Sequence, residues 1–181
     1  MIVLGMGLMC FCVRKKMKES QVITMINVAF ANVPRPAKEF ITGCTCWECL
    51  EIREDFAERN PDELAPDRMG YHSWDMTFLT PEARHYFLPG WMKLGIRQPE
   101  SAYADAVIAL LLSGEGWDTP RLYNMKQHQA IVSFLDLIRR RSGELCDEDL
   151  EAVWKCWTEP EARALNEESE QDVDGNPLAA P

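Results

Sequence analysis

The chain has 181 residues, of which 46% are hydrophobic, and a formal net charge of −10 at pH 7. This length and composition suit one domain with its own hydrophobic core and exclude a miniature scaffold that depends on disulfides. A surface of this sign repels phosphate backbones and anionic lipids, which argues against nucleic-acid and membrane-surface binding and leaves a basic protein partner open.

The first segment, residues 1–19, holds an apolar run of thirteen residues followed by Arg14-Lys15-Lys16. Thirteen helical residues span about 20 Å, less than the roughly 30 Å core of a bilayer, so stable membrane insertion is not expected. The basic residues follow the apolar run, which is atypical of a secretory signal. We therefore expect a cytoplasmic protein whose translation starts at Met17 or Met25, with residues 1–19 as an upstream artefact outside the domain.

Residues 20–157 are predicted to form a compact all-α domain, a single bundle of about six helices with short irregular segments. Apolar residues recur three and four positions apart, and no run of alternation is long enough for a sheet. Residues 102–112 are apolar nearly all round, which predicts a helix in the middle of the domain. The core stripes are expected at Ile23, Ile26, Phe30 and Val33; at Cys49, Ile52 and Phe56; at Ile131, Phe134, Leu135 and Ile138; and at Leu150, Val153, Trp154 and Trp157.

Three cysteines, Cys44, Cys46 and Cys49, form a Cys-x-Cys-x-x-Cys pattern. Thiolates at this spacing can bind one zinc ion, and His72 is the nearest residue along the chain that could complete a tetrahedral set of ligands. The spacing of Cys46 and Cys49 also suits a redox dithiol, although the βαβ context of such motifs is missing. The remaining interpretation is that all three are small buried residues in a reducing cytosol. Zinc is the one cofactor that the sequence suggests.

The stretch Leu79–Pro89 carries several helix signals. Thr80 can cap a helix that has Pro81 at its first position and Glu82 near its positive end. Apolar residues then repeat at helical spacing, which predicts one wide buried face. Pro89 has no N–H and clashes with the carbonyl four residues earlier, so we expect the helix to kink or restart just before it.

His72, Glu82 and His85 support an enzyme hypothesis. Glu82 and His85 stand three residues apart near a helix start, where a carboxylate can hold an imidazole in one tautomer for acid–base catalysis. The sequence contains no nucleophile motif, phosphate-binding loop or metalloprotease motif beside them. We therefore favour a protein that is not an enzyme.

The tryptophans suggest a third function, a protein–protein interaction module. Trp91, Trp154 and Trp157 follow the apolar repeats and are predicted to lie in the core, whereas Trp117 stands in a Gly-containing loop and is a better candidate for a contact surface. Residues 158–181 hold seven acids against one base, which predicts a disordered acidic tail. By elimination, an acidic interaction or regulatory module with a basic partner is our leading hypothesis.

The order of these features resembles an uncharacterised bacterial family of small, mostly α-helical cytosolic proteins, a domain of unknown function. The motif Leu79-Thr80-Pro81-Glu82-Ala83 with Tyr86-Phe87-Leu88-Pro89, the segment Ile26-Asn27-Val28-Ala29-Phe30 and the cysteine pair carry the resemblance, which covers about residues 25–141. It implies no catalytic residue. Helix signals do not explain Arg84 and His85, so function is expected there first, with Arg84 as an interaction residue.

Overall fold

The computed structural model describes residues 16–64, 75–112, 122–143 and 148–159. Within these ranges the chain forms six α-helices and no strand; one isolated antiparallel bridge joins Thr42 and Leu79. The helices are α1 (Glu19–Phe30), α2 (Trp47–Ala57), α4 (Pro81–Arg97), α5 (Tyr103–Leu112), α6 (Met125–Ser142) and α7 (Glu148–Thr158). Short 3-10 turns are η1 (Lys38–Phe40), η2 (Pro61–Glu63) and η3 (Asp75–Phe78). The predicted all-α fold is confirmed.

Helix α4 is the centre of the domain, and twelve of its 17 residues are buried. Its start follows the expected signals, because Thr80 Oγ1 accepts a hydrogen bond from the Ala83 N–H at 3.2 Å and Pro81 takes the first helical position. The helix continues through Pro89 to its end, so it does not restart there. Burial of apolar surface on both sides of Pro89 outweighs the one backbone hydrogen bond that proline cannot make.

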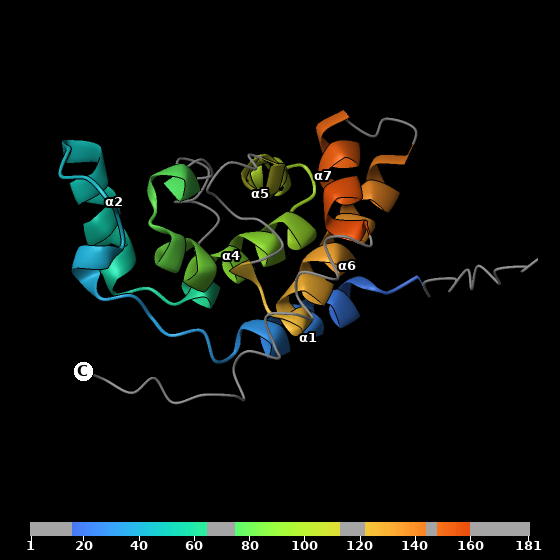
Figure 1. Ribbon diagram of the computed structural model, residues 1–181, viewed down its shortest axis with the longest axis horizontal. Coiled ribbons are helices and arrows are strands. Elements are labelled where there is room, and N and C mark those ends of the chain that lie inside the picture. The colour runs from blue at the N-terminus through green and yellow to red at the C-terminus, as the bar shows by residue number, and fades with distance from the viewer. Residues whose placement is uncertain (1–15, 65–74, 113–121, 144–147, 160–181) are drawn as a thin grey trace, which may run out of the picture.

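Five helices pack in a closed ring. Helix α4 packs against α1 and α5, α1 packs against α6, α6 against α7, and α7 against α5 (Figure 1). The predicted stripes of α6 and α7 face into this ring: Phe134, Leu135 and Trp157 are fully buried and belong to one hydrophobic cluster with α1 and α4. Because each of these helices buries its apolar face against two neighbours, the ring needs no sheet to close its core.

Polar contacts fix how the helices of the ring meet. Lys93 is buried in α4, where its ammonium donates to Asn27 Oδ1 on α1 at 3.0 Å and pairs with Asp62 in η2. On the other side of the ring, the Trp154 indole N–H donates to Asp136 Oδ1 at 2.6 Å and joins α7 to α6. Each contact joins two separate elements through specific polar atoms, so these residues select one arrangement of helices that burial alone would not distinguish.

Helix α2 lies outside the ring, at one end of the domain (Figure 1). Its inner stripe is Cys49, Ile52 and Phe56, as predicted, and the Phe56 ring stacks on Trp91 of α4 with centroids 5.6 Å apart. The C-terminal end of α2 is held by Arg35, which donates to the Arg59 carbonyl oxygen at 2.7 Å. Helix α2 is therefore anchored along its inner face and near its C-terminal end.

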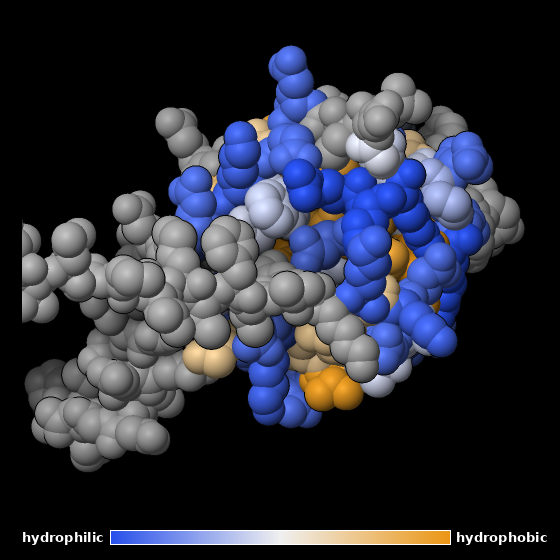
Figure 2. All heavy atoms as spheres, turned by 90° about the vertical axis from the view of Figure 1, so that its right-hand side faces the viewer, coloured by the Kyte–Doolittle hydropathy of each residue, from blue (hydrophilic) through white to orange (hydrophobic). Residues whose placement is uncertain are grey.

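No helix in the described part of the chain is long and apolar enough to cross a bilayer. Figure 2 shows the face on the α6 and α7 side, where hydrophilic side chains cover most of the visible coloured surface and hydrophobic atoms show mainly in the gaps between them. Among the coloured residues of this view, hydrophobic atoms form no broad patch.

Candidate functional site at the start of helix α2

The segment that leads into α2 is tied to the start of α4. The Thr80 N–H donates to the Ile41 carbonyl oxygen at 3.0 Å, and Thr80 Oγ1 donates to the Phe40 carbonyl oxygen at 2.6 Å. Thr42 pairs with Leu79 in the isolated bridge. The motif that caps α4 thus also positions the backbone just before the three cysteines.

One arginine holds the loop between Thr42 and α2. Arg53 donates through Nη2 to the carbonyl oxygens of Thr42 and Cys44, at 3.2 and 3.1 Å, and also reaches Thr42 Oγ1. The buried Thr42 hydroxyl donates to the Cys49 carbonyl oxygen at 3.1 Å. Because Arg53 lies on the same helix as Cys49, one turn further on, these bonds fold the cysteine loop back onto the start of α2.

The three thiols converge. The Sγ atoms of Cys44, Cys46 and Cys49 all lie within 4.8 Å of one another, and the first two are 2.8 Å apart. Cys44 and Cys46 are exposed, whereas Cys49 is buried. The sequence pattern thus folds into a real cluster, which the metal and redox interpretations require; the interpretation as three buried structural residues holds for Cys49 alone.

The thiols differ in acidity. The pKa of Cys44 lies below its ordinary value, mainly because the Cys46 thiol donates a hydrogen bond to it, with help from the Cys49 thiol and the Cys46 N–H. Burial, together with its thiol contacts with Cys44 and Cys46, raises the pKa of Cys49 to about 12. The exposed Cys44 thiol and the buried Cys49 thiol therefore have pKa values shifted in opposite directions.

The outer face of α2 is apolar at its start. Trp47 is 72% exposed and Leu50, one turn further on, is 45% exposed, while Phe40 in the adjoining turn η1 is 61% exposed. Turn η1 packs beside α2, and Lys38 of η1 pairs with Glu54 at 2.6 Å. We call these three exposed apolar residues, together with Glu48 and Glu51, the α2 surface.

The acid–base hypothesis finds limited geometric support. His72 lies outside the described residues. Glu82 is exposed, and His85 is half-buried with its ring edge-on to Phe30 and Tyr123 at 6.0 and 5.2 Å. No hydrogen bond joins Glu82 to His85 within the described ranges, and the buried Nε2 of His85 has no hydrogen-bond partner there. The His85 imidazole is packed as an aromatic ring of the core.

The other predicted interaction residues are placed differently from our expectation. Trp117 lies outside the described residues. Arg84 is only 1% exposed, and its Nε donates to the Leu79 carbonyl oxygen at 3.1 Å, so it braces the turn before α4 and presents no surface to a partner. The predicted core tryptophans Trp91 and Trp157 are fully buried, and Trp154 is partly buried.

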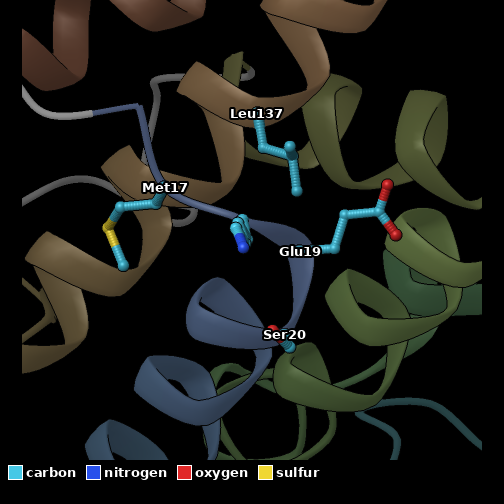
Figure 3. A pocket seen from close by; sticks show the side chains of 5 residues that line it. Met17, Glu19, Ser20 and Leu137 are labelled. Atoms are coloured by element: carbon cyan, nitrogen blue, oxygen red, sulfur yellow. The ribbon is translucent and has the colours of Figure 1, made fainter.

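The structure also forms an open pocket at the start of α1, lined by Met17, Lys18, Glu19, Ser20 and Leu137 (Figure 3). The side chains of Met17 and Glu19 point in opposite directions. The Glu19 carboxylate pairs with Arg141 at 2.6 Å. The carboxylate that lines this pocket is thus already paired, and we take the start of α2 as the candidate site.

Sequence reasoning did not single out Trp47, Leu50 and Phe40 as surface residues. One signal was available for the first two: Trp47 and Leu50 fall out of phase with the Cys49, Ile52 and Phe56 stripe, so a helix that buries the stripe must expose them. Phe40 carries no such signal, because its exposure depends on how η1 lies against α2.

Comparison with known proteins assigns the chain to a family. A family model described as "Family of unknown function (DUF6714)" matches residues 18–161, which is most of the chain, and the chain belongs to this family. No curated protein matches it. No solved structure matches it either. The expected membership of a family of unknown function is confirmed; the motif and bacterial source that we attached to it stay predictions.

Proposed function

We propose that this member of the DUF6714 family is an acidic helical interaction module that binds a basic segment of a partner protein on the α2 surface. The observation that carries the proposal is the 72% exposure of Trp47 at the start of an otherwise well-anchored helix. A large aromatic side chain left in water on a rigid element is typical of binding hot spots, where its burial against a partner supplies much of the affinity.

Charge selects the kind of partner. Helix α2 contains Glu48, Glu51, Glu54 and Asp55 against the single base Arg53, whose guanidinium is engaged with the cysteine loop. Within the described ranges Glu48 and Glu51 are exposed and have no salt-bridge partner. Carboxylates that surround an apolar patch favour lysine or arginine residues around an apolar anchor, and they speed the encounter with such a segment.

The surface is also preorganised. The inner stripe packs Phe56 between Phe87 and Trp91, with centroids 4.9 and 5.6 Å away, and Thr80 fixes the backbone at Phe40. A partner that docks on this surface does not have to order the helix first, so less binding energy is lost to conformational entropy.

Selection from a displayed library of random peptides tests the proposal on the full chain. We expect the enriched peptides to be rich in lysine and arginine with one or two apolar anchors, and their affinity to fall as salt concentration rises. Trp47→Ala should weaken the leading peptide by about 10- to 30-fold, as expected for a hot-spot residue. Glu48→Gln with Glu51→Gln should mainly reduce the association rate and its salt dependence.

The matched control is Val28→Ala on α1, which shortens an apolar side chain that is 66% exposed on another helix. It should leave the affinity unchanged. Enriched peptides without a cationic bias, or an equal loss of affinity in Val28→Ala and Trp47→Ala, would contradict the proposal.

The predicted source and cellular location of the protein are part of this proposal. A cytoplasmic location fits the free thiols of Cys44, Cys46, Cys49 and Cys156, because reducing compartments keep such thiols reduced; a bacterial source stays a prediction from the sequence resemblance. An acid–base activity at His72, Glu82 and His85 stays the alternative hypothesis, and no contact between described residues favours it over binding.

A further inference from the structure

We infer that Cys44, Cys46 and Cys49 form a metal site that binds one zinc ion through three thiolates. The inference goes beyond the proposed docking and does not depend on it. It starts from the convergence of three sulfur atoms within 4.8 Å of one another, contributed by three cysteines in a segment of six residues.

The loop geometry holds the donors ready. Arg53 and Thr42 fix the backbone on both sides of Gly43 through hydrogen bonds to the Thr42, Cys44 and Cys49 carbonyls. The two exposed thiols can therefore move by side-chain rotation alone while the backbone stays in place. A site whose ligands are already gathered in the metal-free chain loses little entropy when the ion binds.

The distances suit zinc after small adjustments. Two thiolates on a tetrahedral zinc ion, each with a bond of about 2.3 Å, lie roughly 3.8 Å apart. The Sγ atoms of Cys44 and Cys46 are 2.8 Å apart and would separate by about 1 Å, and the other Sγ pairs lie within 4.8 Å, so they need to approach by no more than about 1 Å. A disulfide between Cys44 and Cys46 would instead need contraction to about 2.05 Å and would leave Cys49 unused.

The donor set selects a soft ion. Thiolate sulfur suits zinc and copper(I) and disfavours magnesium and calcium, which prefer oxygen ligands. Iron–sulfur clusters are usually held by four cysteines, whereas this site offers three. Each thiol that binds releases its proton to solvent, and the remaining position of a tetrahedral ion can be filled by a water molecule.

Metal binding would act on the helix directly. Cys46 is the residue that precedes the first turn of α2, and no side chain caps that turn. An ion that links Cys46 to Cys49 would span the first turn and restrict the backbone there, at a helix start that has no side-chain cap.

The test uses the full chain without a histidine tag, purified under reducing conditions and stripped with a chelator. Titration with cobalt(II) should give thiolate-to-metal charge-transfer absorption and intense visible bands typical of tetrahedral coordination, and zinc should displace the cobalt at one ion per chain. Cys44→Ser and Cys46→Ser, at exposed positions that leave the core intact, should each lower zinc affinity by at least about 100-fold, since even second-shell changes cost 10- to 100-fold.

Cys156→Ser is the matched control, because Cys156 is an exposed free cysteine on α7 and should not affect binding. Three results would overturn the inference: zinc stoichiometry near zero in the fully reduced chain, stoichiometric binding of copper(I) without zinc, or an equal loss of affinity in Cys156→Ser. A chain that keeps one zinc ion while both single Cys→Ser variants lose it supports the site.

Discussion

In the five-helix ring, α4 buries twelve of its 17 residues, whereas α2 at the end of the domain buries three of its 11. The two regions contain the same residue types in different environments. Trp91 is fully enclosed and stacks on Phe56, while Trp47 stands in solvent beside two exposed thiols. The aromatic residues of the ring hold the fold, whereas the start of α2 leaves an aromatic side chain and two thiols exposed to solvent.

The largest difference between the two regions is expected when one tryptophan is truncated in each. Trp91→Ala removes a fully buried side chain at the centre of the core and should cost about 3–5 kcal/mol of unfolding free energy. Trp47→Ala removes an exposed one and should change stability by less than about 0.5 kcal/mol. Urea unfolding followed by circular dichroism measures both. Equal losses of unfolding free energy would mean that Trp47 contributes to stability as much as a core residue of the ring does.

A pair of glycines tests the same contrast through added volume. A Cβ at Gly90 in α4 would overlap the Pro61 carbonyl oxygen and the Leu64 side chain, whereas a Cβ at Gly43 in the cysteine loop meets nothing within 4 Å. Gly90→Ala should therefore cost about 1–3 kcal/mol by forcing η2 away from α4, and Gly43→Ala should be close to neutral.

Thermal unfolding of the two glycine variants at one pH gives the comparison directly. Neither position has a positive φ angle, so the difference reports packing and not backbone strain. A neutral Gly90→Ala would show that η2 is loosely attached and that the ring ends at α4.

The smallest effect is expected at the junction between the regions, where η2 is capped by Glu63. The Asn60 N–H donates to the Glu63 carboxylate at 2.8 Å, and this bond, with the Asn60 side chain, lowers the Glu63 pKa. A lowered folded pKa means that the stabilisation is complete above the unfolded value, about 4.3, and is lost as pH falls through the folded value.

Glu63→Gln removes this titration, so the variant should lose less stability between pH 5 and pH 3 than the parent chain does. Urea midpoints at several pH values in that interval provide the measurement. Because the carboxylate is at the surface, we expect a slight difference in slope; a steeper acid loss in Glu63→Gln would contradict the role of the cap.

Much of the fold could be predicted because local signals determine helices. The Cys49, Ile52 and Phe56 stripe, the Thr80 cap, and the stripes of α6 and α7 all reappear as buried faces or helix ends. The site was predicted only in part. The cysteine spacing indicated a cluster, but the exposure of Phe40 and the burial of Arg84 depend on contacts between segments about forty residues apart in sequence, such as that of Thr80 with Phe40.

Periodicity and charge predicted the helical class, most of the buried faces and the acidic character, because both are properties of neighbouring residues. The unbroken course of α4 through Pro89, the burial of Arg84 and the meeting of three thiols beside an exposed Trp47 follow from the packing of the folded chain. These outcomes depend on which surfaces pack together, because burial against distant segments outweighs the local preference of any single residue.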